Sequence, residues 1–266
     1  MCLTIAGSDS GGGAGIQADL KAFAACGTHG TCAITALTAQ NTVAVRAVHA
    51  VPAAFIVAQV RAVVEDFGVD VVKLGMLGGT ASIGAVAEAL GYVSDEVPVV
   101  LDPVMVAESG ARLLESGAVE ALVTQLLPRA TVVTPNLPEA RVLAGAGEDE
   151  QDVEALARTI QALGPRAVLV TGGHRKAAVD VLVDGTSVTE IPGPRHPDGA
   201  AHGSGCTHAS ALAAHLAHGF SLHDAAVAAR VVAGEAVRRG LRGLGSGAGP
   251  VDVLGVVERM PVRQGR

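Results

Sequence analysis

Short apolar runs rich in β-branched residues alternate along the chain with longer, Ala-rich stretches of helical periodicity. The apolar runs predict strands near Leu3–Ala6, Gly30–Ala36, Val69–Leu74, Val97–Leu101, Thr131–Thr134 and Ala167–Thr171. The stretches between them predict helices near Gly15–Cys26, Pro52–Phe67, Ala81–Leu90, Gly117–Leu126, Pro138–Leu143 and Asp152–Leu163. Continuous apolar strands separated by helices are typical of a parallel sheet covered on both faces. The pattern therefore predicts a doubly wound α/β fold.

The pattern changes after the last of these strands. Ala177–Val183 and Ser187–Ile191 are apolar runs separated by Asp184-Gly185-Thr186, and Asp-Gly between such runs predicts a hairpin. Two long helices are then expected, at Cys206–His218 and Leu222–Arg239. Earlier in the chain, the alternation in Thr42–Ala50 favours a small flap at a sheet edge.

Composition limits the class of protein. The 266 residues are 49% hydrophobic but only 2% aromatic, with 34 glycines, so the core must be built mainly from Ala, Val and Leu. We expect one domain over residues 1–266, with a partly loose C-terminal segment over 243–266 that begins with the Gly- and Ser-rich stretch Gly243–Gly249. The net charge of −7 and the lack of a basic run argue against nucleic acid or an anionic membrane surface as partner.

Cysteine usage and the N-terminus favour the cytoplasm. Cys2, Cys26, Cys32 and Cys206 contain no CxxC pair, so we expect reduced thiols. No charged region precedes an apolar stretch at the N-terminus, and no apolar run is long enough to cross a bilayer. The nine histidines have no metal-ligand spacing with cysteines or carboxylates and are expected on the surface.

The loop His202–Thr207 opens a predicted helix and is the strongest candidate for an anion site. Gly203, Ser204 and Gly205 permit close backbone approach, and the free N–H groups of a helix N-terminus attract negative charge. Cys206 at that position is expected to have a lowered pKa and to take a proton from a reacting hydroxyl. The alternatives are an ordinary turn and a buried cysteine that only fills space.

Other polar residues follow the predicted strands, where the ligands of such sheets bind. A Gly-rich turn, Gly7–Gly15, follows the first strand, but it is not the dinucleotide fingerprint, and no P-loop motif occurs in the chain. Gln40 and Asn41 are amides suited to reading a polar heterocycle, and Met76 is suited to forming one wall of its pocket.

Carboxylates and a further turn complete this edge. Asp102 follows the fourth strand, and Asn136 and Glu139 lie three residues apart at a helix start. That pair is able to hold a hydrated Mg²⁺, but locally the spacing favours an N-cap with its capping-box partner. Thr171-Gly172-Gly173-His174 forms another backbone-rich turn.

These motifs together, in this order, resemble the hydroxymethylpyrimidine/phosphomethylpyrimidine kinase family of thiamine biosynthesis. The resemblance rests on Thr4–Asp9, Gly15–Lys21, Thr35–Asn41, Lys73–Leu77, Leu101–Met105, Thr134–Ala140, Gly172–His174 and Gly203–Thr207. It implies a ribokinase-like three-layer sandwich and a cytosolic homodimer that uses ATP and Mg²⁺. The implied reaction is phosphorylation of 4-amino-5-hydroxymethyl-2-methylpyrimidine, and then of its monophosphate to the diphosphate.

The resemblance also implies roles for single residues. It places the pyrimidine against Gly7, Asp19, Gln40 and Met76. It places the catalytic anion hole at Gly203, Ser204, Gly205 and Cys206, with Cys206 where ribokinase relatives usually carry an aspartate. ATP is expected at Asn136, Glu139, Thr171 and Gly173, and Mg²⁺ at Asp102 and Glu139.

Three departures from the family pattern concern the nucleotide. Family members often carry Lys where this chain has Glu108 and Thr171, and Asn-Thr where it has Ala200-Ala201. Two alternatives are open for the missing positive charge: Arg175 or Lys176 supplies it, or the metal carries more of the neutralisation. Two alternatives stay open, a B6-vitamer kinase and a non-catalytic pyrimidine-binding regulator. Gln40 and Met76 favour the pyrimidine over the vitamer, and the intact anion hole argues against the regulator.

Overall fold

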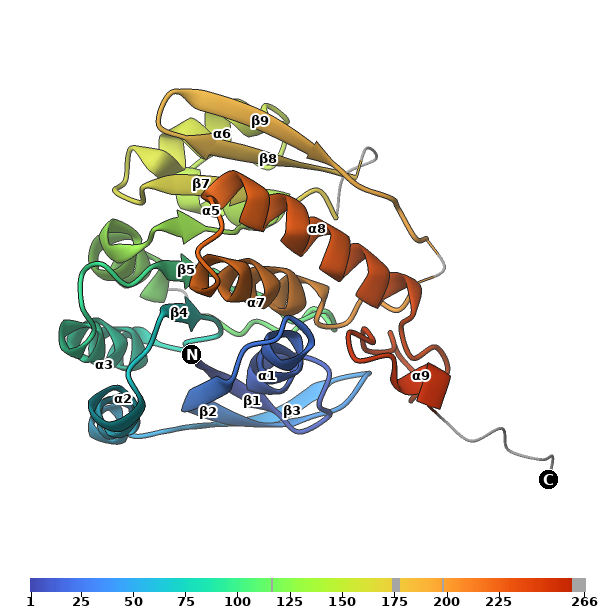
Figure 1. The fold of residues 1–266 in the computed structure, drawn as a ribbon, viewed down its shortest axis with the longest axis horizontal. Coiled ribbons are helices and arrows are strands. Elements are labelled where there is room, and N and C mark those ends of the chain that lie inside the picture. The colour runs from blue at the N-terminus through green and yellow to red at the C-terminus, as the bar shows by residue number, and fades with distance from the viewer. Residues whose placement is uncertain (116, 174–177, 198, 260–266) are drawn as a thin grey trace.

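A single nine-stranded sheet runs through the described part of the chain (Figure 1). The computed structural model describes residues 1–115, 117–173, 178–197 and 199–259. The strands lie in the order β3-β2-β1-β4-β5-β6-β7-β8-β9. Their bounds are β1 Cys2–Asp9, β2 Gly30–Gln40, β3 Val45–Ala50, β4 Val71–Leu74, β5 Val99–Leu101, β6 Val132–Val133, β7 Ala167–Val170, β8 Val179–Asp184 and β9 Ser187–Pro192.

The connections explain which strands are parallel. The six central strands, from β2 to β7 in the sheet order, are parallel, as helical crossovers require. Short turns make the outer pairs antiparallel: β3 pairs with β2 at Thr38 and Val48, and β9 pairs with β8 at Val183 and Val188. The predicted parallel sheet and hairpin are therefore confirmed, and the expected flap is the edge strand β3.

Helices cover both faces of the sheet. Their bounds are α1 Gly15–Ala25, α2 Ala53–Phe67, α3 Thr80–Ala89, α4 Ala118–Ala121, α5 Leu137–Ala144, α6 Val153–Gln161, α7 Ser204–Ala217, α8 Leu222–Arg238 and α9 Val256–Arg259. Buried side chains of α1, α7 and α8 pack on one face, and those of α2 to α6 pack on the other. Figure 1 shows α7 and α8 side by side across the sheet, with α1 next to α7.

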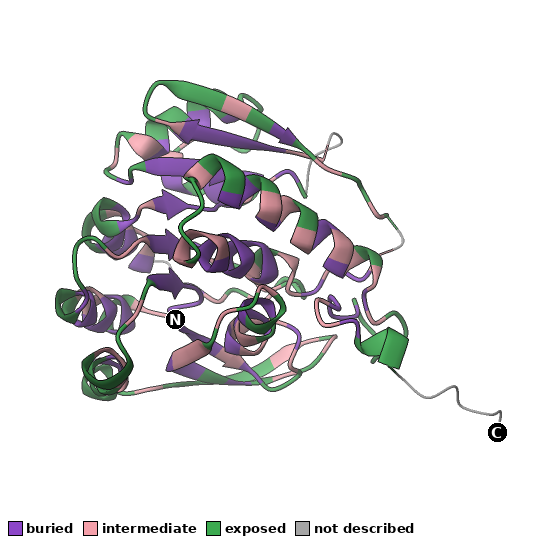
Figure 2. Cartoon of the chain, viewed as in Figure 1, coloured by how far each residue is buried: buried purple, intermediate pink, exposed green. Residues whose placement is uncertain are grey.

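The two faces are built from different side chains. Leu, Ile and Val dominate beneath α2 to α6, whereas the layer formed by α7 and α8 is rich in alanine, such as Ala211, Ala213 and Ala229. Alanine allows these helices to approach each other and the sheet closely, so a core with few aromatic residues is still filled. In Figure 2 the strands are mostly buried, whereas the helices have buried inner and exposed outer faces.

One predicted helix is wrong in type over most of its length. Only Ala118–Ala121 of the expected helix 117–126 is α-helical; Leu122–Leu126 forms a π-helical turn and Leu127–Arg129 a 3₁₀ turn. Pro128 has no N–H and its ring crowds the preceding turn. The Thr124 hydroxyl also donates to the Glu120 carbonyl at 2.8 Å, which competes with the backbone ladder.

Residues 245–252 lie against the loops that follow β1 and β2 and against the loop before α7. Residues 243–248 are exposed, but Pro250, Val251 and Asp252 are buried. The Val251 amide donates to the His202 carbonyl at 3.1 Å, and the Asp252 amide to that of Ala236 at 2.9 Å. Among the described residues, no helix has the length and apolar character required to span a bilayer.

Candidate functional site

A cavity of about 440 Å³ lies at the carboxyl ends of the central strands, beside the N-terminus of α7. Parallel strands bring the loops that follow them to one edge, which is why motifs distant in sequence meet there. Nearly all of the residues expected at the site line this cavity. They are Gly7, Gln40, Met76, Asp102, Asn136, Glu139, Thr171, Gly173, Gly203, Ser204, Gly205 and Cys206.

Gly7 and Met76 form one wall of the cavity. The Gly7 amide donates to the Met76 carbonyl at 3.0 Å, and the Thr35 hydroxyl donates to the same carbonyl at 2.7 Å. A Cβ on Gly7 would lie 2.9 Å from the Met76 sulfur, so glycine is needed for the thioether to lie there. This gives the apolar surface on which a flat heterocycle can rest.

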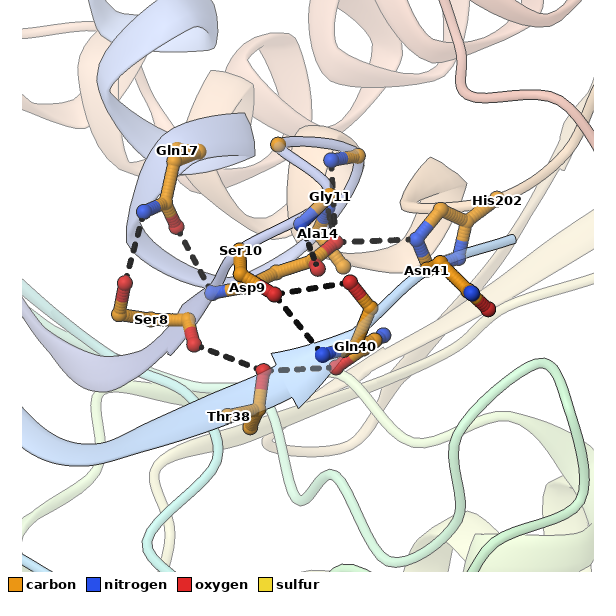
Figure 3. A network of polar contacts seen from close by, with 12 residues as sticks. Ser8, Asp9, Ser10, Gly11, Ala14, Gln17, Thr38, Gln40, Asn41 and His202 are labelled. Atoms are coloured by element: carbon orange, nitrogen blue, oxygen red, sulfur yellow. Dashed lines mark hydrogen bonds and ion pairs between the residues drawn. The ribbon is translucent and has the colours of Figure 1, made fainter. Parts of the chain in front are cut away.

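Gln40 lies at the end of β2 and is oriented by its neighbours (Figure 3). The Thr38 hydroxyl lies 3.2 Å from Gln40 Oε1, and the backbone N–H of Gln40 donates to Ser10 Oγ at 2.8 Å. The single proton of the Thr38 hydroxyl also has the Ser8 carbonyl as an acceptor, at 3.0 Å, so the Gln40 side-chain amide lines the cavity as a group with both an acceptor and donors. Asn41 is not among the residues that line the cavity, and its Oδ1 accepts from the backbone amides of Val43 and Ala44 in the turn before β3.

Asp19 is not brought to the cavity. Its carboxylate is fully buried and accepts from Thr4 Oγ1 at 2.7 Å, Ser210 Oγ at 2.8 Å and Lys73 Nζ at 2.9 Å. Lys73, also fully buried, lies 3.7 Å from Asp102 Oδ2. The expected contact between Asp19 and a substrate is therefore replaced by a structural role, in which Asp19 holds a buried cation beside Asp102.

The loop expected to form an anion hole precedes α7 and provides its N-cap. Gly203 is the N-cap of α7 with φ +83°, a left-handed conformation suited to glycine, and a Cβ there would collide with the Gly13 carbonyl. The Ser204 amide donates to the Ala201 carbonyl, and the Thr207 amide to that of Gly203. Gly205 and Cys206 lie between them in the first turn, where amides have no intrahelical acceptor.

Cys206 differs from expectation in its ionisation. Burial raises the pKa of the thiol to about 12, an effect that the nearby Lys73 charge and a hydrogen bond from the Gly15 amide oppose but do not overcome. The predicted lowered pKa is therefore wrong. The carboxylates of Asp102 and Asp19 also disfavour a thiolate, so the group that meets a ligand is a neutral thiol.

Asn136 and Glu139 form the capping box of α5. Glu139 N donates to Asn136 Oδ1, and Asn136 N donates to Glu139 Oε2, both at 2.9 Å. Burial, and then repulsion from Asp102, raise the pKa of Glu139 to about 8. Asp102 Oδ2 is buried with no hydrogen-bond partner among the described residues, and burial also raises the pKa of Asp102. Two carboxyl groups thus lie near each other, and Asp102 Oδ2 already has a buried cation, Lys73 Nζ, 3.7 Å away.

Two histidines are buried, contrary to the expectation of surface positions. His202 Nε2 lies 3.1 Å from Asp9 Oδ2, and His208 Nε2 lies 3.1 Å from Asp180 Oδ2. All four residues line the cavity, and none was predicted as a site residue. Asp9, in the Gly-rich turn, and His202, next to Gly203, carried a local signal, whereas Asp180 and His208 carried none.

The nucleotide departures fall on the cavity wall. Glu108, Thr171 and Ala201 line it, so the absence of lysine at the first two positions removes positive charge from the site itself. Arg195 and Arg230 also line the cavity. The expected substitutes, Arg175 and Lys176, lie with His174 outside the described residues.

Comparisons with known proteins show to which family the chain belongs. Residues 9–252 match the family described as Phosphomethylpyrimidine kinase. The chain belongs to this family. The hydroxymethylpyrimidine/phosphomethylpyrimidine kinase of Streptomyces coelicolor is 47% identical over 254 residues, which cover 95% of this chain and 93% of that protein.

Two further proteins are similar to this chain, one by sequence and one by solved structure. The thiamine biosynthesis bifunctional protein ThiED of Geobacter sulfurreducens is 48% identical over 94% of this chain, and the match spans about half of that longer protein (51%). Among solved structures, the pyridoxal kinase of Bacillus subtilis, in a complex with ADP, is 36% identical with a TM-score of 0.86 and covers 96% of this chain and 98% of that chain. The ribokinase-like α/β fold is thereby confirmed.

Proposed function

We propose that the protein transfers the γ-phosphoryl group of ATP to the hydroxyl of 4-amino-5-hydroxymethyl-2-methylpyrimidine, and then a second one to the monophosphate formed. In the first step the hydroxyl oxygen bonds to phosphorus, the bond to the bridging oxygen of ATP breaks, ADP leaves and the hydroxyl proton is released. The second step is the same with a phosphate oxygen as nucleophile. The observation that carries the proposal is one cavity with an amide and thioether wall at one end and a helix N-terminus at the other.

Each half of the cavity suits one reactant. Gln40 offers a side-chain donor and Met76 an apolar surface, which fit the ring nitrogens and flat face of an aminopyrimidine. The first turn of α7 offers amides to the transferring phosphoryl group. Phosphoryl transfer depends mainly on alignment and charge neutralisation, and the amides at the start of α7 would contribute to both.

Magnesium fits the carboxyl groups near the phosphoryl end. Mg²⁺ prefers few protein carboxylates and keeps waters and phosphate oxygens as its other ligands. Asp102 and Glu139 would hold it: Asp102 Oδ2 accepts no hydrogen bond among the described residues, although Lys73 Nζ lies 3.7 Å away, and burial and then repulsion from Asp102 raise the pKa of Glu139. When bound, the ion would neutralise charge on the transferring group.

Cys206 acts in this proposal by orienting the acceptor hydroxyl. A thiol whose pKa is raised to about 12 is a poor proton acceptor near neutrality, but it remains a donor and a weak acceptor beside the anion hole. The hydroxyl is thereby held in line with the phosphorus.

A B6 vitamer is the second candidate substrate, because the pyridoxal kinase of Bacillus subtilis superposes closely on this chain. Purified protein with Mg²⁺ and ATP is to be assayed for ADP release with the hydroxymethylpyrimidine, its monophosphate and pyridoxal in parallel. We expect turnover of both pyrimidines, with two successive products resolved by chromatography. Turnover of pyridoxal alone would establish the second candidate, and ligand binding without any turnover would favour a regulator.

We also propose that the protein is a cytoplasmic homodimer, as the family resemblance implies and as use of ATP supports. β3 forms one edge of the sheet, and residues 46–50 are all exposed. Exposed edges of this kind are commonly protected by pairing or cover. Sedimentation velocity should give the mass of two chains, and Val48→Lys in β3 should lower that mass; a monomer at all concentrations would contradict the assembly.

A further inference from the structure

We propose that Asp9 and His202 form a positioning pair that holds the Gly-rich loop after β1 against the anion-hole loop, and so aligns Cys206 with the acceptor hydroxyl. The proposal concerns how the kinase reaction is aligned and rests on the activity proposed above. Figure 3 shows the His202 ring reaching the Asp9 carboxylate from the opposite side of the loop. The two residues lie 193 positions apart in the chain.

Asp9 organises the Gly-rich loop. Its Oδ1 accepts from Gly11 N at 2.8 Å, and its Oδ2 accepts from Gly13 N at 3.0 Å and Ala14 N at 2.9 Å. Burial alone would raise the pKa of Asp9, but the hydrogen bonds from His202 and from these amides hold it below its ordinary value. Asp9 is therefore an ionised, acceptor-only group, and its partner His202 Nε2 carries the proton.

His202 belongs to the other loop. It directly precedes Gly203, and its backbone is fixed by the C-terminal segment: His202 N donates to Gly249 O at 3.2 Å, and Val251 N donates to His202 O at 3.1 Å. The ring is thus anchored at its backbone before it reaches Asp9. The pair therefore connects the anion-hole loop, which the C-terminal segment holds by hydrogen bonds, to the loop after β1, which consists largely of glycine.

The two loops also touch directly, and the contact leads to Cys206. A Cβ on Gly13 would collide with the His202 ring, and a Cβ on Gly203 would collide with the Gly13 carbonyl. Two residues beyond Gly13, the Gly15 amide donates to the Cys206 sulfur. The thiol of the anion-hole loop is therefore oriented by the Gly-rich loop, whose place the Asp9–His202 pair sets.

The kinetic test separates positioning from folding. His202→Leu should lower kcat by about 10²-fold, the loss that a small misplacement of reacting groups causes, with KM for ATP and for the pyrimidine within about twofold. His202→Gln places an amide donor near the Nε2 position and should recover most of the rate. Asp9→Asn should resemble His202→Leu, and the double variant should be no slower than the slower single variant. His215→Leu, on α7 and outside the cavity lining, is the matched control and should keep kcat.

A second measurement does not depend on turnover. Hydrogen exchange should rise together in residues 9–15 and 199–206 for His202→Leu, and in neither segment for His215→Leu. Folded His202→Leu with kcat within twofold of the unaltered protein, loss of rate without rescue by Gln, or exchange that rises in one loop only would each overturn the proposal. If exchange rises in both loops but the protein phosphorylates none of the substrates, the pair does connect the loops and the proposed activity is wrong.

Discussion

At the scale of single residues, Gln40 is the side chain that we propose reads the ring of the substrate. Its side-chain amide has both an acceptor and donors for the polar edge of a ring, and the Thr38 hydroxyl lies 3.2 Å from Oε1. Gln40→Leu should raise the KM for the pyrimidine by roughly 10- to 100-fold, because losing one partner of a buried hydrogen bond costs about 1–3 kcal/mol. Initial rates measure the KM, and calorimetric titration with the pyrimidine measures the loss of affinity. Thr38→Val, which frees Oε1 but keeps the amide, should have a smaller effect; equal affinity of Gln40→Leu and unaltered protein would remove Gln40 from the site.

Cys206 is a residue whose chemistry burial changes. With its pKa raised to about 12, the thiol should not titrate between pH 6 and 9, and the rate profile in that range should not follow a cysteine. Cys206→Ala should lower kcat by at least about tenfold while leaving ATP affinity within twofold, because orientation is lost but the α7 amides remain. Cys206→Asp, the residue type of ribokinase relatives, should retain part of the rate. A near-normal kcat in the Ala variant would leave the cysteine with a space-filling role.

Glu108 puts negative charge on the wall expected to face a polyanion. Glu108→Lys should lower the KM for ATP about threefold at low salt, since an exposed charge pair is worth little and is screened as salt rises. Initial rates at 20 mM and 300 mM salt measure the change. Glu120→Lys on α4 has the same charge change outside the cavity lining and should leave KM unaltered; an equal effect of both would mean that only net charge matters.

Sequence motifs predict the residues whose role depends on neighbours in the chain. They do not predict the role of residues whose partners are distant in the sequence. The Gly203 N-cap and the Asn136–Glu139 box depend on neighbours within a few positions, so the sequence predicts them. Asp19 pairs with Lys73, 54 positions away, and becomes a buried structural group instead of a ligand contact. The same reason explains the missed burial of His202, and the pKa of Cys206, since both depend on which segments the fold packs over them.

At the scale of elements, the start of α5 carries two interpretations, a cap and a metal site. Asn136→Ala should destabilise the protein by about 1 kcal/mol by removing the cap, measured by urea unfolding. Asn136→Asp keeps an N-cap acceptor and should lose less stability. If the box acts only as a cap, the Mg²⁺ dependence of the rate should be unchanged in both variants. A raised Mg²⁺ requirement in the Ala variant that the Asp variant does not share would assign Asn136 to the metal as well.

Elements were predicted well where the apolar period is clear and less well where a helix must deform. The central strands fall within their predicted ranges or close to them, because β-branched runs between helices have no other stable arrangement. The helix predicted over 117–126 has a suitable period, yet Pro128 and the Thr124 back-bond convert most of it to π and 3₁₀ turns. Periodicity reports which face is buried and not how many residues each turn holds.

At the scale of the whole molecule, acid stability depends on buried carboxylates that link layers. Asp180 on β8 is 1% exposed and connects three elements: its Oδ1 accepts from Gly172 N at 2.7 Å, its Oδ2 lies 3.1 Å from His208 on α7, and Arg230 on α8 lies 3.8 Å away. Burial alone would raise the pKa of Asp180, but His208 and then Arg230 hold it below its ordinary value of 3.8.

The sign of the pH effect follows from that shift. A carboxyl group whose pKa is lower in the folded than in the unfolded chain contributes stability above the unfolded value, and loses it as pH falls through the folded value. Asp180→Asn should therefore reduce the free energy of unfolding by about 3 kcal/mol at pH 7, as expected for breaking a buried ion pair. The difference from the unaltered protein should shrink steadily below pH 4. Urea unfolding at pH 7, 5 and 3 measures it, with the exposed Asp149→Asn as control. A difference that is the same at all three values would mean that Asp180 stabilises the layers by packing and not by its charge.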